Sequence, residues 1–369
     1  MSAAGPVDFV VEPAELHRFG AVLLSTIAMI DATHASRAGQ PVALAYGIAA
    51  LTPITLDIHK LALACFQSAG NYQSCENLLT PSFIKKFEEI EPALARGIAA
   101  GLFAVDKLVG GGESPVTATA VATASVAVAA SIPALLGRLQ RSSASQEILI
   151  ETSSGVSGRQ FTMYLPGTEY WLPLNSKKAF DLGSDLAAFA KPGVSAPERA
   201  AVQALAAEGF GTRPGDSLTL VGYSEGGIIG ANLISSGAVT HLGGRVGGLV
   251  AVASPVSAAQ LPEGTRVISI EHTDDPVPAL DLAEHNSDSN WTTVKLAPVG
   301  LQTHELSSYQ QSLSNLPTQQ LAKLNEALAG ITGGRQYGSA EITGFEAVRT
   351  RGLNRQLKRN PAARATSPL

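Results

Sequence analysis

Residues 222–226, Gly-Tyr-Ser-Glu-Gly, place one serine, Ser224, in a short turn with a glycine at each end. The apolar run 218–221 before the turn predicts a buried strand, and the small and aliphatic residues after it suit a helix. A serine in such a G-x-S-x-G turn is lifted clear of the sheet, with its Oγ exposed. We therefore predict that Ser224 is a nucleophile. The alternative, in a chain with 36 glycines, is a plain glycine-rich turn with a solvent-facing serine.

A serine nucleophile requires a base that takes its proton and an acid that orients the base. Two aspartates, Asp274 and Asp275, follow the predicted strand 266–270, at the end where ligand-facing residues of a parallel sheet lie. We predict Asp275 as the acid, because Pro276 and Pro278 fix the loop geometry around it, and Asp274 is the reserve candidate. The alternative role for both aspartates is the capping of a turn or helix.

The candidate bases are three histidines near these aspartates. His285 lies in a polar loop before the last predicted strand, 292–296, whereas His304 follows that strand and begins the last predicted helix. On a sheet of this kind the base comes after the acid and after a late strand. The position therefore predicts His304 as the base, and His272, which precedes the aspartates, is not expected to act as one.

Attack by the serine creates an oxyanion, which needs preorganised hydrogen-bond donors. The backbone N–H of Glu225, directly after the serine, is one predicted donor, and the other comes from the loop after an earlier strand, 161–165. We assign this second donor to the backbone N–H of Thr168, with Gly167 and Glu169 as alternatives. The Pro-Gly pair in this loop could also be a simple turn.

The elements that must position these residues alternate between strands and helices after residue 145. This alternation predicts an α/β fold with a mostly parallel sheet that is covered by helices on both faces. The predicted strands are 147–151, 161–165, 218–221, 249–253, 267–270 and 292–296, and the predicted helices are 177–190, 196–208, the segment after 226, and 305–328.

Residues 1–142 are predicted to form an all-α helical N-terminal module without strands, because apolar residues recur there at three- and four-residue spacing. Residues 114–137 carry no charge and could span a bilayer by length. They consist largely of Ala, Thr and Ser, which insert poorly, so we expect a buried helix of a small bundle. The α/β part is predicted over 145–330, and a weakly ordered basic tail over 334–369, either solvated or bound to an acidic surface or lipid headgroups.

Composition limits the classes of protein that remain. The 369 residues are 45% hydrophobic, so the chain can bury a substantial core in one large or two ordinary domains. Only two cysteines, Cys65 and Cys75, are present, which excludes a disulfide-built scaffold and leaves open one bridge or two free thiols. The net charge of -5 argues against nucleic acid as the main partner.

Residues 222–226, residues 275–278 (Asp-Pro-Val-Pro) and His304 together resemble the serine α/β-hydrolases, particularly the lipase and esterase branch. In that branch the acid often lies in a D-x-V-P loop. The resemblance covers about residues 145–330 and implies a catalytic triad, an acyl-serine intermediate, and no metal or organic cofactor. A departure is that residues 165–168 stand where a His-Gly-Gly-Gly oxyanion segment would be expected.

The helical N-terminal region is similar to the antiparallel helical modules beside hydrolase domains in actinobacterial proteins that are exported without a cleaved signal. Residues 72–76 fit the Y-x-x-x-[D/E] pattern associated with that route, although the W-x-G turn of such modules is missing. Residues 1–15 contain no Lys or Arg, so a cleaved signal peptide is not expected. Localisation is left open between the cytoplasm and a signal-less export route.

These observations predict a serine hydrolase of carboxylic esters that acts on a small-molecule or lipid ester. The N-terminal helices are candidates for contact with a membrane surface or a protein partner, and the oligomeric state is not specified. Two alternatives stay open: a catalytically silent hydrolase-fold interaction or export protein, and an acyltransferase that uses the same triad.

Overall fold

A computed structural model gives the arrangement of the chain. It describes residues 115–155, 158–168, 178–180, 184, 188, 193, 195–275, 277–281, 283, 286, 288–300, 302–334 and 338–349. Predictions for residues 1–114, including Cys65, Cys75 and the 72–76 motif, lie outside the described residues, as do those for His285, Glu169 and 350–369.

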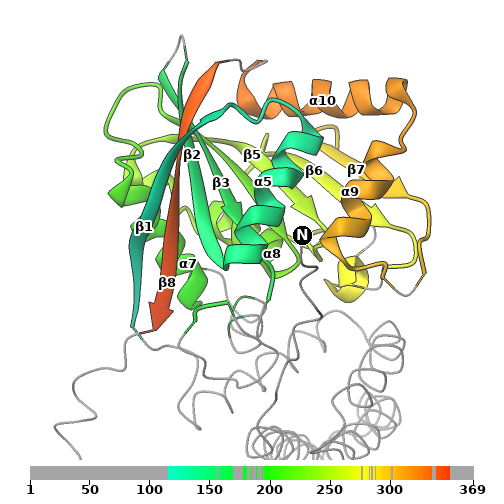
Figure 1. The fold of residues 1–369 in the computed structure, drawn as a ribbon, viewed down its shortest axis with the longest axis horizontal. Coiled ribbons are helices and arrows are strands. Elements are labelled where there is room, and N and C mark those ends of the chain that lie inside the picture. Colours follow the sequence, from blue (N-terminus) through cyan, green and yellow to red (C-terminus); the bar gives the residue numbers. More distant parts are fainter. Residues whose placement is uncertain are drawn as a thin grey trace, which may run out of the picture.

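The described residues form an α/β structure around one eight-stranded sheet (Figure 1). The strand order is β1-β8-β2-β3-β4-β5-β6-β7; strands β3 to β7 run parallel, whereas β1, β8, β2 and β3 pair antiparallel. The strands are β1 (Val116–Ala127), β2 (Glu147–Gly155), β3 (Gly158–Leu165), β4 (Ser217–Tyr223), β5 (Arg245–Val252), β6 (Arg266–His272), β7 (Trp291–Leu296) and β8 (Ser339–Arg349).

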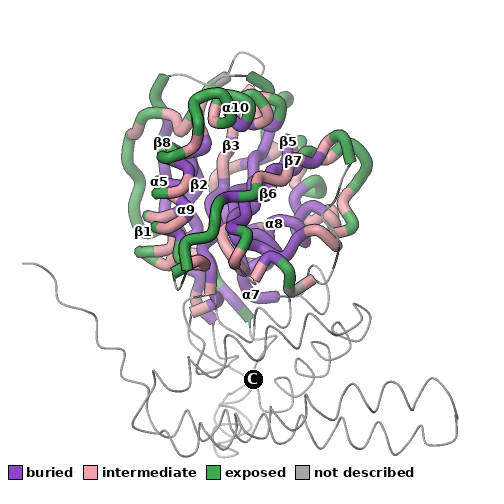
Figure 2. The backbone as a smooth tube through the Cα atoms, turned by 90° about the vertical axis from the view of Figure 1, so that its right-hand side faces the viewer, coloured by how far each residue is buried: buried purple, intermediate pink, exposed green. Residues whose placement is uncertain are grey.

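Helices cover both faces of the sheet and define two apolar layers (Figures 1 and 2). Helices α5, α9 and α10 pack on one face, and α7 and α8 pack on the other. Leu220 contributes to the second layer and its neighbour Val221 to the first, because successive side chains of a strand point to opposite faces. The helices are α5 (Ile132–Ser145), α7 (Ala196–Ala207), α8 (Glu225–Ser235), α9 (Leu306–Ser314) and α10 (Thr318–Thr332), with short 3-10 helices η1 (Thr240–Leu242) and η2 (Val277–Asp281).

The six strands predicted from apolar runs are all present, and the apolar character of the central ones matches their burial on both faces. The predicted helix 196–208 corresponds to α7. The predicted single helix 305–328 is instead two helices, α9 and α10, which are separated before Thr318 by Pro317. Proline lacks the N–H that a continuing helix needs, so the chain breaks there.

The predicted buried helix over 114–137 is wrong. Residues 116–127 form strand β1, most of whose side chains are exposed, and the helix α5 begins only at Ile132. The segment alternates Thr and Val with Ala, and β-branched residues favour an extended backbone. The strand-free region predicted over 1–142 therefore does not hold for its last part, which belongs to the sheet. No helix in the described part of the chain is long and apolar enough to cross a membrane.

The predicted weakly ordered tail is corrected over residues 339–349. This segment is β8, which lies between β1 and β2 and buries Ile342, Phe345 and Ala347. Its two pairing partners are far away in the sequence, so a local reading of a stretch with glycine and charged residues could not supply them. The sheet therefore extends on both sides of the predicted 145–330 boundaries.

Candidate active site

Ser224 occupies a strained turn between β4 and α8. It has φ 52° and ψ -119°, which is an uncommon backbone conformation for a residue with a Cβ atom. The turn is fixed by two backbone bonds: Ser224 N–H donates to Val252 O at 2.9 Å, and Gly227 N–H donates to Ser224 O at 3.0 Å. Strain of this kind persists only where the surroundings enforce it, and it concentrates at functional sites.

Glycines allow the backbone to pass closely on each side of the serine. A Cβ atom at Gly222 would overlap the backbone of Gly226, and one at Gly226 would overlap the carbonyl oxygen of Leu165. A Cβ atom at Gly167 would lie 3.2 Å from Ser224 Cβ. The loop after β3 therefore lies directly against the serine, as the sequence predicts for the loop that carries an oxyanion donor.

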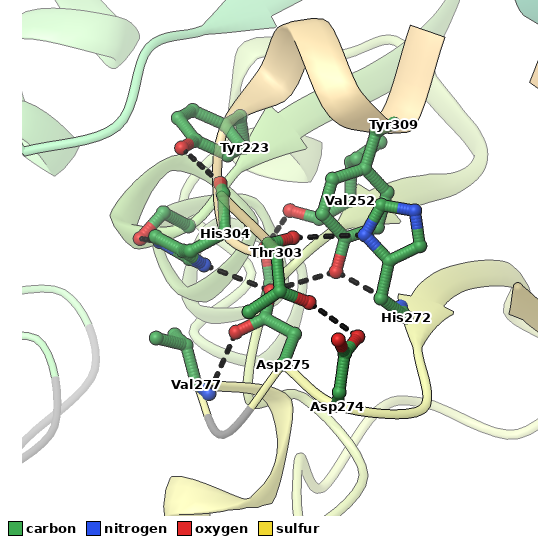
Figure 3. A network of polar contacts seen from close by, with 11 residues as sticks. Tyr223, Val252, His272, Asp274, Asp275, Val277, Thr303, His304 and Tyr309 are labelled. Carbon is green, nitrogen blue, oxygen red and sulfur yellow. Dashed lines mark hydrogen bonds and ion pairs between the residues drawn. The ribbon is translucent and has the colours of Figure 1, made fainter. Parts of the chain in front are cut away.

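The structure brings together the three residues predicted as nucleophile, base and acid. His304 Nε2 lies 3.0 Å from Ser224 Oγ. His304 Nδ1 lies 2.9 Å from Asp275 Oδ2, as Figure 3 shows. Because the carboxylate can only accept, Nδ1 of the neutral imidazole carries the proton and Nε2 accepts from the serine hydroxyl. The side chain of Asp275 is fully buried, whereas that of His304 is 29% exposed. The predicted acid is thus shielded from solvent, while the predicted base remains accessible.

Two further donors hold the carboxylate of Asp275. The backbone N–H of Val277 donates to Oδ1 at 3.0 Å, and the hydroxyl of Tyr309 donates to Oδ2 at 2.7 Å (Figure 3). With His304 on Oδ2, every oxygen of this buried carboxylate has a partner. A buried charge requires such compensation.

The reserve candidate for the acid, Asp274, does not contact His304. It instead holds the loop that precedes His304 through three hydrogen bonds. Its Oδ2 accepts from the backbone N–H groups of Val299 and Gly300 at 2.9 and 2.8 Å, and its Oδ1 accepts from the hydroxyl of Thr303 at 2.5 Å. Burial alone would raise the pKa of Asp274, but these hydrogen bonds outweigh it, and the pKa is lowered. Asp274 therefore ties the end of β6 to the loop before α9.

Tyr223, the residue before Ser224, contacts His304 directly. Its ring stacks on the imidazole of His304, and its hydroxyl donates to the carbonyl oxygen of the same residue. Burial, with the nearby charges of Asp275 and Glu305, raises the pKa of Tyr223 well above its usual value. The hydroxyl therefore stays protonated and remains a donor.

His272 was not expected to act as a base, and it lies buried behind the site. Its Nδ1 is 2.8 Å from Thr303 O (Figure 3). Its Nε2 is 2.9 Å from Ser312 Oγ. Because a carbonyl oxygen only accepts, Nδ1 must carry the proton and Nε2 accepts from the serine hydroxyl. His272 thus supports the residue that precedes His304.

The predicted oxyanion donors lie at the start of α8 and in the loop after β3. Glu225 is the first residue of α8, where the first N–H groups of a helix have no intrahelical partner and the helix dipole is positive. Thr168 is half-buried and follows Gly167, whose backbone lies against Ser224. Both segments therefore flank the serine, although Glu169, the other alternative donor, lies outside the described residues.

The supporting roles of Tyr223, Tyr309 and His272 were not predicted from the sequence. One signal was available for Tyr309: it shares the three- and four-residue spacing of Leu306 and Leu313, which predicts that it faces the core. A tyrosine on a buried face needs a partner for its hydroxyl. Identifying that partner as Asp275 required the structure.

Among the described residues, no group of three or more His, Cys, Asp or Glu side chains is arranged to hold a metal ion. In comparisons with protein-family models, curated proteins and solved structures, nothing matches the chain. The site is therefore interpreted from its own geometry.

Proposed function

We propose that the chain is a serine hydrolase of α/β-hydrolase type that cleaves carboxylic esters through an acyl-serine intermediate. The observation that carries the proposal is the continuous hydrogen-bonded series from Ser224 Oγ through the imidazole of His304 to Asp275 Oδ2, with links of 3.0 and 2.9 Å. Such a series activates a hydroxyl that is otherwise a weak nucleophile. The strained turn at Ser224 supports the same interpretation, because it presents the hydroxyl above the ends of the parallel strands.

In the first half-reaction, Ser224 Oγ attacks the ester carbonyl while His304 Nε2 takes the hydroxyl proton. Asp275 stabilises the resulting imidazolium through Nδ1. The N–H groups of Glu225 and Thr168 are the proposed donors to the oxyanion. The imidazolium then gives its proton to the leaving alkoxide oxygen, the C–O bond breaks, and the acyl group stays on Ser224.

In the second half-reaction, water takes the place of the alcohol. His304 accepts a proton from the water as it attacks the acyl carbonyl, and then returns that proton to Ser224 Oγ as the acid is released. No oxidant, reductant or metal enters this balance. An acyltransferase would differ only in using an acceptor alcohol in place of water, so the same residues serve both reactions.

The experiment is labelling with a fluorophosphonate probe together with hydrolysis of a short p-nitrophenyl ester. We expect Ser224→Ala to abolish the label and to lower kcat by roughly 10⁴-fold or more, and His304→Ala to have a comparable effect. Ser235→Ala is the matched control, because Ser235 lies at the far end of the same helix and its hydroxyl donates to the backbone oxygen of Asn232 at 3.2 Å.

Three results distinguish the proposal from its alternatives. Turnover by Ser224→Ala at the parental rate would show that the nucleophile is wrong. An unlabelled Ser224 in folded wild-type protein would favour a catalytically silent fold. Preferential transfer of the acyl group to an added alcohol, at the expense of hydrolysis, would identify an acyltransferase.

A further inference from the structure

The hydroxyl of Tyr309 makes two hydrogen bonds, one of them to the proposed acid, Asp275. Tyr309 is on α9, is fully buried, and its hydroxyl contacts Asp275 Oδ2 at 2.7 Å and the backbone nitrogen of His272 at 3.0 Å. Its ring also packs against the imidazole of His272, with the ring centroids 4.0 Å apart. These contacts fix the position of the phenol relative to β6 and to the acid.

The direction of both hydrogen bonds follows from the atoms involved. The backbone N–H of His272 can only donate, so it uses a lone pair of the phenol oxygen. The single phenol proton is then directed to Asp275 Oδ2, the oxygen that also accepts from His304 Nδ1. Burial and the negative charge of Asp275 raise the pKa of Tyr309 far above its usual value, so the phenol keeps this proton.

We propose that Tyr309 is a positioning residue, whose hydroxyl orients the Asp275 carboxylate toward Nδ1 of His304 and shares the negative charge on Oδ2. The inference rests on the proposed function, since it concerns the acid and base of that site. A neutral donor on Oδ2 disperses part of the negative charge that the imidazolium would otherwise feel. It also fixes Oδ2 in the direction of Nδ1, which the bond from Val277 to Oδ1 alone does not ensure.

Other titratable groups lie near Asp275 and His304, and a variant that tests Tyr309 must leave them unchanged. Those from β6 and the loop that follows it are Glu271, His272 and Asp274; Tyr223 comes from β4, and Glu305 from the turn before α9. Tyr309→Phe alters none of these groups and removes only the phenol oxygen that makes the two hydrogen bonds. The control Tyr164→Phe removes the hydroxyl of another fully buried tyrosine, on β3, which contacts Glu151 of β2 at 3.4 Å.

The test measures kcat, KM and the pH dependence of p-nitrophenyl ester hydrolysis, and titrates the His304 imidazole by NMR. For Tyr309→Phe we expect kcat to fall by about tenfold with KM within about twofold, in line with the loss of one hydrogen bond to a charged group. The pKa of His304, and the acidic limb of kcat/KM, should move upward by about half a unit, because an undispersed carboxylate stabilises the imidazolium more strongly. Tyr164→Phe should change neither quantity.

A second variant keeps the test decisive if Tyr309→Phe does not fold. Site-specific Tyr309→3-fluorotyrosine has a more acidic phenol, which donates more strongly, so the pKa of His304 should move downward. A purely structural role for Tyr309 would produce no such opposite shifts. An unchanged His304 pKa in the folded variants would overturn the inference. Absence of fluorophosphonate label on wild-type Ser224 would instead overturn the proposed function, and the NMR titration would still decide the role of Tyr309.

Discussion

Tyr223 holds His304 through both its ring and its hydroxyl. The ring centroids of the two side chains are 5.4 Å apart with an interplanar angle of 28°, and the tyrosine hydroxyl donates to the carbonyl oxygen of His304 at 2.6 Å. The residue that precedes Ser224 in the chain therefore also positions His304. Strand β4 thus positions both partners of the proposed proton transfer.

Replacing Tyr223 separates these two contacts. Tyr223→Phe keeps the stacking and loses the hydrogen bond, so we expect a loss of about 1 kcal/mol in the free energy of unfolding and a kcat that is a few-fold lower. Tyr223→Ala loses both contacts and should reduce kcat further, by roughly tenfold beyond the phenylalanine variant. Steady-state kinetics and urea unfolding measure the two effects. Equal kcat values for wild type and both variants would show that Tyr223 does not position His304.

Asp274→Asn should loosen the loop before α9 without touching the triad. An amide has one oxygen where the carboxylate has two, so it cannot accept all the hydrogen bonds from Val299, Gly300 and Thr303. We expect kcat to fall by about tenfold, with stability lowered by about 1 kcal/mol. Asp288→Asn, at an exposed position, is the control and should leave both quantities unchanged.

The same aspartate predicts a sign for the pH dependence of stability. Its folded-state pKa is lowered relative to the unfolded chain, where it is about 3.9. The stabilisation is therefore complete above about pH 5 and is lost as the pH falls through about 4 toward the folded-state pKa. Urea unfolding between pH 3 and 7 should show a smaller acid dependence for Asp274→Asn than for wild type. An identical acid dependence in the two proteins would rule out this contribution.

Gly222→Ala tests the close approach of β4 and α8. A methyl group there would overlap backbone atoms of Gly226, which cannot move aside as a side chain can. We expect a loss of more than about 2 kcal/mol in the free energy of unfolding. In contrast, Gly137→Ala in α5 has no atom within 4 Å of the added group and should stabilise the helix by up to about 1 kcal/mol. A Gly222→Ala protein as stable as wild type would contradict the geometry of the turn.

The sequence predicted those site residues whose positions follow from a local pattern of strand and turn residues. Ser224, Asp275 and His304 each follow an apolar run, and parallel strands bring such ends to one edge of a sheet. The roles of Asp274 and Tyr309 could not be predicted in this way. They depend on which side-chain atom of one loop meets which backbone group of another, and no spacing within either segment encodes that.

The first and last strands escaped prediction for a different reason. Val116–Ala127 has few apolar residues large enough to define a face, and Ser339–Arg349 is interrupted by Gly344 and by charged residues. Each becomes a strand because it pairs with the other, across more than two hundred residues of sequence. Local propensity is a weak guide where a non-local partner decides the structure.

Phe345→Ala tests whether β8 belongs to the core. The side chain is 2% exposed and contributes to the same apolar layer as Leu220, so its removal should cost about 3–5 kcal/mol of stability. Glu341→Ala on the same strand, at an exposed position, should change stability by less than about 0.5 kcal/mol. If both variants unfolded at the same urea concentration as wild type, residues 339–349 would not form part of the folded sheet.

The place of β8 between β1 and β2 has a consequence for the order of folding. The ribosome makes β1 and β2 long before residues 339–349 exist, yet these two strands have no direct pairing and meet only through β8. During synthesis, the edge of β2 that pairs with β8 therefore stays unpaired until β8 is made. The parallel strands that carry Ser224 and Asp275 are complete before that point. Contacts of such long sequence separation form slowly, and an unpaired strand edge is prone to aggregation. The nascent chain would thus carry Ser224 and Asp275 in place on a sheet whose other side still lacks a strand.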